Sequence, residues 1–149
     1  MMKEKKKFQL LTSKDICRVY KLLHKEGLIS FPIKQGAEGQ IEAIVASINS
    51  SYFGQEIYRS PEEKTVAYLY FLIKDHAFTD GNKRTATLCF AILCELNNLV
   101  PQYKGFSLDE VVVYIEKSKD KDYQRVIKVV AMLLFPDFEA AQPLTVVHP

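Results

Sequence analysis

The chain has 149 residues, 48% of them apolar, and a formal net charge of +2. This length suits one packed domain and is too short for two ordinary ones, and the small charge argues against nucleic acid as a partner. No run approaches the roughly 18 apolar residues of a membrane span, and the basic start has no hydrophobic stretch behind it to form a secretory signal. We therefore expect a cytoplasmic protein without a membrane partner.

Residues 1–10 are rich in lysine and lack periodic apolar positions, so we expect a flexible basic N-terminus. A helix is predicted next, because Thr12 or Ser13 can cap it and apolar side chains then recur on one face. Gly27 supplies the conformational freedom with which such a helix commonly ends.

A second helix is predicted from about Ala37 to Ser50, with apolar side chains at helical spacing that face inward. The segment Tyr52–Arg59 interrupts the helical pattern, since it is rich in aromatic residues and bounded by Ser-Ser and Ser-Pro. This composition predicts a short extended segment or a hairpin, and a plain loop between helices is the alternative.

Two strongly helical segments follow and flank a short loop. Ser60-Pro61-Glu62-Glu63 is a helix start with a cap, a proline at the first helical position and acids in the first turn, and this helix leads to His76. Asn82 is placed to cap the next helix, which is apolar over most of its circumference. We therefore expect the helix after Asn82 to be the buried centre of the domain.

Two more helices complete the pattern. Ser107-Leu-Asp-Glu110 is a capping box for one of them, and Asp120 or Asp122 starts the other, which a proline stops. Residues 137–149 lack continuous helix signals and are predicted to form an extended or mobile tail. The sequence thus predicts one all-α domain of about six helices over residues 11–136.

The loop His76-Ala-Phe-Thr-Asp-Gly-Asn-Lys-Arg84 concentrates chemically useful groups. His76 is a candidate base for an attacking hydroxyl, because the unperturbed pKa of histidine, about 6.5, lies near working pH. Asp80 offers a hard oxygen ligand for Mg²⁺, which binds through about one or two carboxylates together with substrate phosphates. Phe78 lies between these two residues and is predicted to anchor the loop in the core.

The start of the helix after this loop has the features of a phosphate site. Unpaired N–H groups and partial positive charge at a helix N-terminus attract anions, and Gly81 lets the backbone approach a phosphate without a Cβ clash. Asn82 is expected to cap the helix while other N–H groups point at the ligand. Lys83 and Arg84 occupy a first turn where the helix dipole prefers acids, and this placement indicates an anionic partner.

Each of these residues also has an ordinary structural interpretation. His76 can be a solvated or core histidine, Asp80 can cap the loop, and Gly81 and Asn82 suit any plain junction between a loop and a helix.

The cysteines fall within apolar helical patterns, where reduced cysteine behaves as a small hydrophobe, and neither they nor the histidines have zinc-ligand spacing. The three cysteines are Cys17, Cys89 and Cys94.

The loop resembles the motif of the Fic/Doc family, His-x-Phe-x-Asp/Glu-Gly/Ala-Asn-x-Arg, whose members transfer part of a nucleoside triphosphate to a hydroxyl on a target protein. The pattern is highly specific, and the similarity extends over about residues 37–100. All six specified positions match, namely His76, Phe78, Asp80, Gly81, Asn82 and Arg84, and Lys83 occupies the variable position before the arginine.

Within the family, the chain is similar to the death-on-curing (Doc) branch, a toxin of toxin–antitoxin pairs that phosphorylates a translation elongation factor. Typical Fic adenylyltransferases have a glycine after the asparagine and a second arginine three residues past the first, where this chain has Lys83 and Thr87. Asn82-Lys-Arg-Thr-Ala86 instead looks like Doc, although Gly81 stands where the Doc toxin has alanine. Ser51–Asn98 also looks like the carboxy-terminal part of RhuM-type virulence proteins.

The resemblance implies a compact Fic-type helical bundle and a Mg²⁺-dependent transferase that uses ATP or another nucleoside triphosphate. It further implies a flap that aligns the target by strand addition beside the active loop, for which we expect residues 54–60. The implied site residues are the catalytic His76, Arg84 and Lys83, the nucleotide-binding Gly81, Asn82, Lys83 and Arg84, the metal ligand Asp80, and the flap residues Gly54, Gln55, Glu56, Ile57 and Tyr58.

Several functions remain open at this point. Phosphoryl transfer to a Ser, Thr or Tyr hydroxyl is favoured, AMP transfer is the alternative within the enzymes, and a nucleotide-binding pseudoenzyme, an adaptor or a helical interaction module lies outside them. Many Fic proteins carry an inhibitory helix with the pattern Ser/Thr-x-x-x-Glu-Gly/Asn. The Glu-Gly pairs at Glu26 and Glu38 are preceded by Leu22 and Lys34 at the required distance and do not fit. We therefore expect any restraint to come from an antitoxin-like partner.

Overall fold

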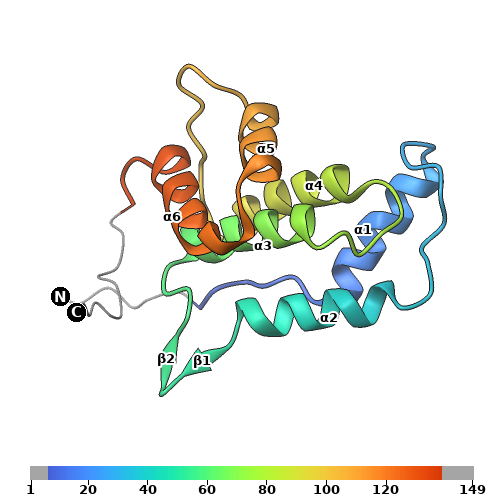
Figure 1. Cartoon of the computed structure of the whole chain (residues 1–149), viewed down its shortest axis with the longest axis horizontal. Coiled ribbons are helices and arrows are strands. Elements are labelled where there is room, and N and C mark those ends of the chain that lie inside the picture. The colour runs from blue at the N-terminus through green and yellow to red at the C-terminus, as the bar shows by residue number, and fades with distance from the viewer. Residues whose placement is uncertain (1–6, 139–149) are drawn as a thin grey trace.

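The computed structural model describes residues 7–138, and the outer parts of both predicted tails, residues 1–6 and 139–149, lie outside it. The described chain forms six helices longer than one turn, a short 3₁₀ helix at Asp120–Asp122 and an antiparallel hairpin of β1 (Ser51–Tyr52) and β2 (Gln55–Glu56), which confirms the predicted all-α class. None of these helices is long and apolar enough to cross a lipid bilayer. They are α1 (Ser13–Lys25), α2 (Ala37–Ile48), α3 (Pro61–Lys74), α4 (Asn82–Leu96), α5 (Leu108–Lys117) and α6 (Tyr123–Leu134) (Figure 1).

Side-chain caps begin three of the helices, as the sequence predicts. At α1 the hydroxyl of Thr12 accepts from the N–H of Asp15 at 3.2 Å, and the Asp15 carboxylate accepts from the N–H of Thr12 at 2.9 Å. Ser60 accepts a first-turn N–H of α3 at 3.0 Å. Ser107 and Glu110 form a second reciprocal pair at α5. Local hydrogen bonds therefore fix where these helices begin.

The centre of the domain is α3, and the prediction that α4 takes this place is wrong. α3 packs against α2, α4, α5 and α6, and ten of its 14 residues are buried. α4 buries one face and exposes Ala91, Glu95 and Leu96. Polar residues conceal the central position of α3 in the sequence: Lys64 is buried because its ammonium group pairs with the carboxylate of Glu56 at 2.5 Å.

The segment before α1, which includes the inner part of the predicted flexible N-terminus, packs along α3 and against the end of α4. The N–H of Gln9 donates to Oδ1 of Asn97 at 2.8 Å, and the Gln9 carbonyl accepts from Nδ2 of Asn97 at 3.0 Å. The buried hydroxyl of Tyr68 donates to the carbonyl of Leu11 at 2.7 Å.

The cysteines are buried in the core and unpaired, as predicted, and burial raises the pKa of two of the thiols to about 12. The two thiols are those of Cys89 and Cys94, and burial also raises the pKa of the third, Cys17.

The hairpin forms where the sequence predicts it, but at the opposite end of α3 from the loop that carries His76. β1 and β2 precede the first residue of α3, whereas the loop follows its last residue (Figure 1). A helix of 14 residues rises about 21 Å, so the hairpin does not lie beside the loop as expected. The physical reason is that an unbroken helix separates the segment before it from the segment after it.

Candidate active site

Phe78 pins the loop between α3 and α4 to the core, as predicted. Its ring stacks on that of Tyr20 in α1, with 4.1 Å between the ring centroids and 22° between the planes, and both rings are buried. The hydroxyl of Tyr20 also donates to the carbonyl of Phe31 at 2.6 Å. Tyr20 therefore holds both the loop and the segment between α1 and α2 that faces it.

Gly81, and not Asn82, is the N-cap residue of α4, which corrects the predicted cap. Gly81 has a φ of 78°, in the left-handed region that glycine tolerates, and Asn82 is the first helical residue. The Asn82 side chain turns back instead. Its Oδ1 accepts from the N–H of Phe78 at 3.1 Å, and its Nδ2 donates to the Phe78 carbonyl at 2.9 Å. Asn82 thus closes the loop rather than capping the helix.

The first turn of α4 is left open toward solvent. It has no side-chain cap and no acid, and the N–H of Thr85 makes the first backbone bond of the helix, to the Gly81 carbonyl at 2.9 Å. Among residues 7–138 the three N–H groups before Thr85, at positions 82–84, have no hydrogen-bond acceptor. This arrangement suits an anion, because unpaired N–H groups and the helix dipole both favour negative charge.

A cavity of about 390 Å³ opens at this helix start, and its size lies in the range of small-molecule sites. It brings together every predicted site residue of the loop. The cavity is lined by His76, Thr79, Asp80, Gly81, Asn82, Lys83 and Arg84, by Leu28 and Ser30 of the facing segment, and by Ile73 and Glu116.

His76 lies at the mouth of this cavity with its side chain exposed. Its φ of 47° is unusual for a residue with a side chain, and such backbones persist where the surroundings fix them. The residue before it is held in place, since Nε2 of Gln40 donates to the Asp75 carbonyl at 2.6 Å. Burial and the nearby Asp120 raise the pKa of the Asp75 carboxyl, and the charge of His76 lowers it.

The two cations of the first turn make different contacts. Nη1 of Arg84 donates to the Leu28 carbonyl at 3.0 Å, and Nζ of Lys83 pairs with Oε2 of Glu116 at 3.5 Å. Each cation keeps further donors for a ligand. Glu116 was missed by sequence reasoning because it lies in α5, far along the chain, and only the packing of α5 beside α3 brings it to the loop.

Ile29 forms the floor beneath Gly81. A Cβ atom at position 81 would lie 2.4 Å from Cδ1 and 2.7 Å from Cγ1 of Ile29, which is itself buried. Neither the backbone conformation nor the space at position 81 suits a side chain. Glycine is therefore the residue that the packing requires here.

Asp80 lines the cavity with an exposed side chain, where it was predicted to hold a metal ion. In the part of the chain that the structure describes, no three His, Cys, Asp or Glu side chains gather into a metal site. One carboxylate beside a phosphate site does fit Mg²⁺, which commonly binds through few protein ligands and the substrate phosphates. The donor set therefore suits a metal ion that arrives together with a phosphate ligand.

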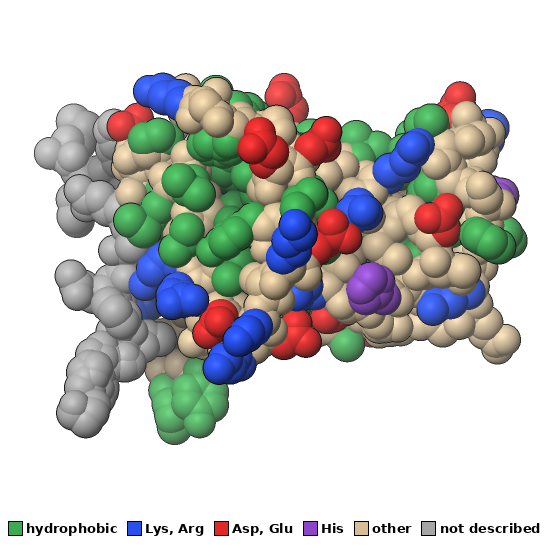
Figure 2. All heavy atoms as spheres, turned by 45° about the horizontal axis from the view of Figure 1, so that its top comes forward, with side chains coloured by type: hydrophobic (Ala, Val, Ile, Leu, Met, Phe, Trp, Pro, Cys, Tyr) green, Lys and Arg blue, Asp and Glu red, His purple; other side chains and the backbone are tan. Residues whose placement is uncertain are grey.

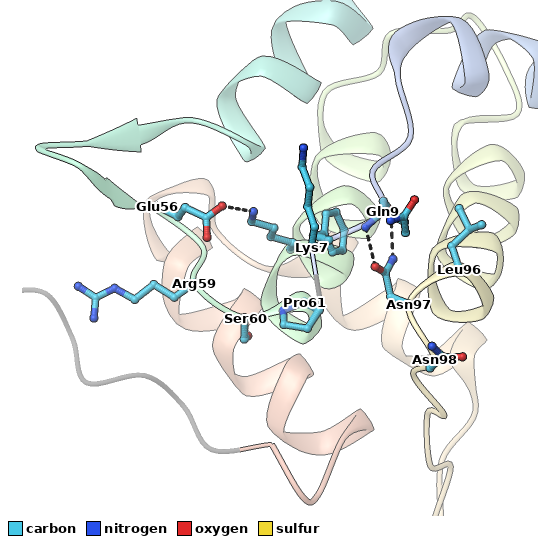
Figure 3. Close-up of a pocket in the computed structure, with 11 residues that line it drawn as sticks. Lys7, Gln9, Glu56, Arg59, Ser60, Pro61, Leu96, Asn97 and Asn98 are labelled. Carbon is cyan, nitrogen blue, oxygen red and sulfur yellow. Dashed lines mark hydrogen bonds and ion pairs between the residues drawn. The ribbon is translucent and has the colours of Figure 1, made fainter. Parts of the chain in front are cut away.

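The predicted flap residues gather at a different place. A second cavity, of about 800 Å³, lies where the hairpin and the segment before α1 approach the end of α4, and Glu56, Arg59 and Lys7 are among its lining residues (Figure 3). Residues 54–57 are exposed and Tyr58 is buried. Residues 28–33, which the sequence did not single out, take the position facing the loop.

The sequence model of the Fic/DOC family matches residues 10–94, which is more than half of the chain and includes the whole loop and the start of α4. No curated protein and no solved structure matches the chain significantly. Members of this family are generally transferases that move a nucleotide-derived group to proteins. With its motif assembled around one cavity and most of the helical core inside the matched region, the chain belongs to the Fic/Doc family.

Proposed function

We propose that this protein transfers a phosphate-containing group from ATP or another nucleoside triphosphate to a Ser, Thr or Tyr hydroxyl of a target protein. The observation that carries the proposal is the uncapped start of α4, which shares one cavity with His76 and Asp80. Phosphoryl transfer is favoured over AMP transfer, because Lys83 and Thr87 stand where Fic adenylyltransferases typically have glycine and arginine.

In the proposed reaction the phosphates lie on the first turn of α4. Its N–H groups, together with Lys83 and Arg84, offset the negative charge that builds up during transfer. A divalent metal ion held with Asp80 would supply further charge neutralisation. His76 takes the proton of the target hydroxyl as the oxygen bonds to phosphorus. Attack at the γ phosphorus releases ADP, and attack at the α phosphorus releases pyrophosphate.

ATP labelled separately at the α and γ phosphates tests this function. The protein is incubated with cell lysate, Mg²⁺ and each labelled nucleotide, and the labelled proteins are separated on a gel. Label from the γ position on a protein supports phosphoryl transfer, and label from the α position supports AMP transfer. Transfer of neither label contradicts the proposed enzyme and favours a nucleotide-binding adaptor.

Replacing Asp80 by alanine is expected to remove the contribution of Mg²⁺ to nucleotide binding, because the variant lacks the proposed protein ligand of the metal. Isothermal titration of an ATP analogue that resists hydrolysis, with Mg²⁺ or with EDTA, measures this contribution. Asp109→Ala is the control, since it removes an exposed carboxylate from the first turn of α5, the end of this helix opposite to Glu116. An unchanged effect of Mg²⁺ in Asp80→Ala would exclude Asp80 as the ligand.

We keep target docking by the hairpin in the proposal, on the condition that the target reaches both the hairpin and the loop. Phe53 and Tyr52 are 91% and 68% exposed, with their rings edge to face at 4.5 Å, and Figure 2 shows an apolar projection at the lower left where the hairpin lies. Phe53 also has a φ of 50° in a turn that normally favours Asn-Gly. An exposed aromatic ring on a strained backbone indicates a binding role. A target that touches the hairpin and the loop together must span the length of α3, about 21 Å.

Phe53→Asn is therefore expected to raise the free energy of unfolding by about 0.5–1 kcal/mol, since asparagine accepts the left-handed turn, and to slow transfer to a folded target. Nucleotide affinity should not change, because the hairpin is remote from the loop. Denaturant unfolding, titration calorimetry and γ-label incorporation measure the three quantities. Tyr114→Asn removes an exposed aromatic side chain from α5 as a control, and equal transfer by both variants would refute docking through Phe53.

A further inference from the structure

Glu116 is an acid in a cavity that is otherwise built for an anion. It lines the same cavity as the open first turn of α4, and its carboxylate oxygen lies 3.5 Å from Nζ of Lys83. The side chain is 37% exposed, so part of it is shielded from solvent. Asp80 has a proposed role as a metal ligand, but Glu116 has none in the transfer reaction, and a negative charge here opposes a polyphosphate.

The position of Glu116 is set by the packing of α5 on α3. Nζ of Lys74, the last residue of α3, donates to the carbonyl of Glu116 at 3.3 Å and to that of Ser118 at 2.6 Å. The same ammonium group pairs with Asp120 at 3.3 Å, and the Lys74 side chain is only 14% exposed. The end of α5 is thus tied to the last residue of α3, two positions before His76. The carboxylate therefore sits at the cavity wall through the fold and not through one exposed ion pair alone.

This geometry has an electrostatic consequence that depends on the charge of the ligand. A nucleotide that reaches Lys83 must share or displace its contact with Glu116, and the carboxylate repels the phosphates at short range. A divalent metal ion bound to the phosphates reduces their negative charge, and with it the repulsion. The penalty from Glu116 is consequently larger for free nucleotide than for its metal complex.

We propose that Glu116 is a specificity-determining residue, which makes the site select metal-complexed nucleotide over free nucleotide. The inference rests on the proposed function, because it presupposes that the cavity binds a nucleoside triphosphate. It adds that Lys83 is paired with a carboxylate of the cavity wall, which repels the metal complex less than it repels free nucleotide.

The test compares wild-type protein with Glu116→Gln, which keeps the side-chain size and removes the charge. Titration calorimetry measures the affinity for a hydrolysis-resistant ATP analogue, once with excess Mg²⁺ and once with EDTA. The control is Glu95→Gln, which makes the same change of net charge on an exposed position of α4, 13 residues beyond Asn82 and about 20 Å along the helix. Thermal unfolding of each variant confirms that the fold is retained.

The expected result is that Glu116→Gln binds free nucleotide about 3- to 10-fold more tightly than the wild type, while affinity for the metal complex changes less than about 2-fold. The ratio of the affinity for the metal complex to that for free nucleotide therefore becomes smaller in Glu116→Gln, and Glu95→Gln leaves this ratio unchanged. The inference is overturned if the wild type binds nucleotide but Glu116→Gln shows the same preference for the metal complex. It is also overturned if Glu116→Gln binds both forms more weakly than the wild type. Either result leaves the proposed function standing. Binding of neither form by the wild type overturns both.

Discussion

Replacement of His76 by alanine is expected to lower the turnover of group transfer by about 10²-fold or more, while the affinity for nucleotide should stay within about 2-fold of the wild type. The expected loss follows from the proposed role of His76 as the base that takes the proton of the target hydroxyl. Binding should persist because the proposed phosphate site is the first turn of α4, to which the imidazole does not belong. Rates of γ-label incorporation at saturating nucleotide, together with titration calorimetry, separate the two quantities.

The backbone at His76 calls for a second variant. Its φ of 47° is tolerated better by asparagine than by alanine, so His76→Asn removes the base with less strain in the loop. His24→Ala, on α1, removes a histidine that does not line the cavity and serves as the control. Turnover near the wild-type value in both His76 variants would remove this residue from the mechanism.

Gly81→Ala is expected to lower the free energy of unfolding by about 2 kcal/mol or more and to weaken nucleotide binding by at least about 10-fold. A left-handed backbone costs an L-residue about 1–2 kcal/mol, and the new methyl group overlaps the buried side chain of Ile29. Either Ile29 or the start of α4 must move, and the second movement shifts the N–H groups that face the phosphates. Denaturant unfolding and titration calorimetry measure the two effects.

Gly105 provides a matched control for this change. It has a φ of 82°, close to that of Gly81, but a Cβ atom there would meet nothing within 4 Å. Gly105→Ala therefore carries the backbone cost alone, and the difference between the two variants isolates the clash with Ile29. Combining Gly81→Ala with Ile29→Ala should give a smaller loss than the sum of the single changes. Equal destabilisation by the two glycine variants would show that Ile29 yields without cost.

The features that the sequence predicts well are those that depend on neighbours in the chain. The caps at Thr12, Ser60 and Ser107 use groups only three residues apart, so their patterns indicate the helix starts directly. The loop from His76 to Arg84 is contiguous as well, and one short pattern contains most of the cavity wall.

The features that it predicts poorly depend on contacts between distant segments. Asn82 has the composition of a cap, yet its amide finds a better use in closing the loop on Phe78 once Gly81 takes the left-handed position. The burial of Lys64 depends on the carboxylate of Glu56 in the hairpin, and this contact is not visible in the residues of α3 alone. The position of the hairpin likewise follows from the length of α3, and that of residues 28–33 from the hydrogen bonds that Tyr20 and Arg84 donate to this segment.

A substitution of Tyr20, which is not among the residues that line the cavity, is expected to inactivate this protein. The ring of Tyr20 stacks on Phe78 of the loop and its hydroxyl holds the facing segment, so both sides of the cavity depend on one side chain of α1. A genetic screen for inactive alleles should consequently return substitutions at this position, although the phenol never meets a substrate. Tyr20→Phe would separate the two contacts, because it retains the stacking on Phe78 and removes only the hydrogen bond to the carbonyl of Phe31.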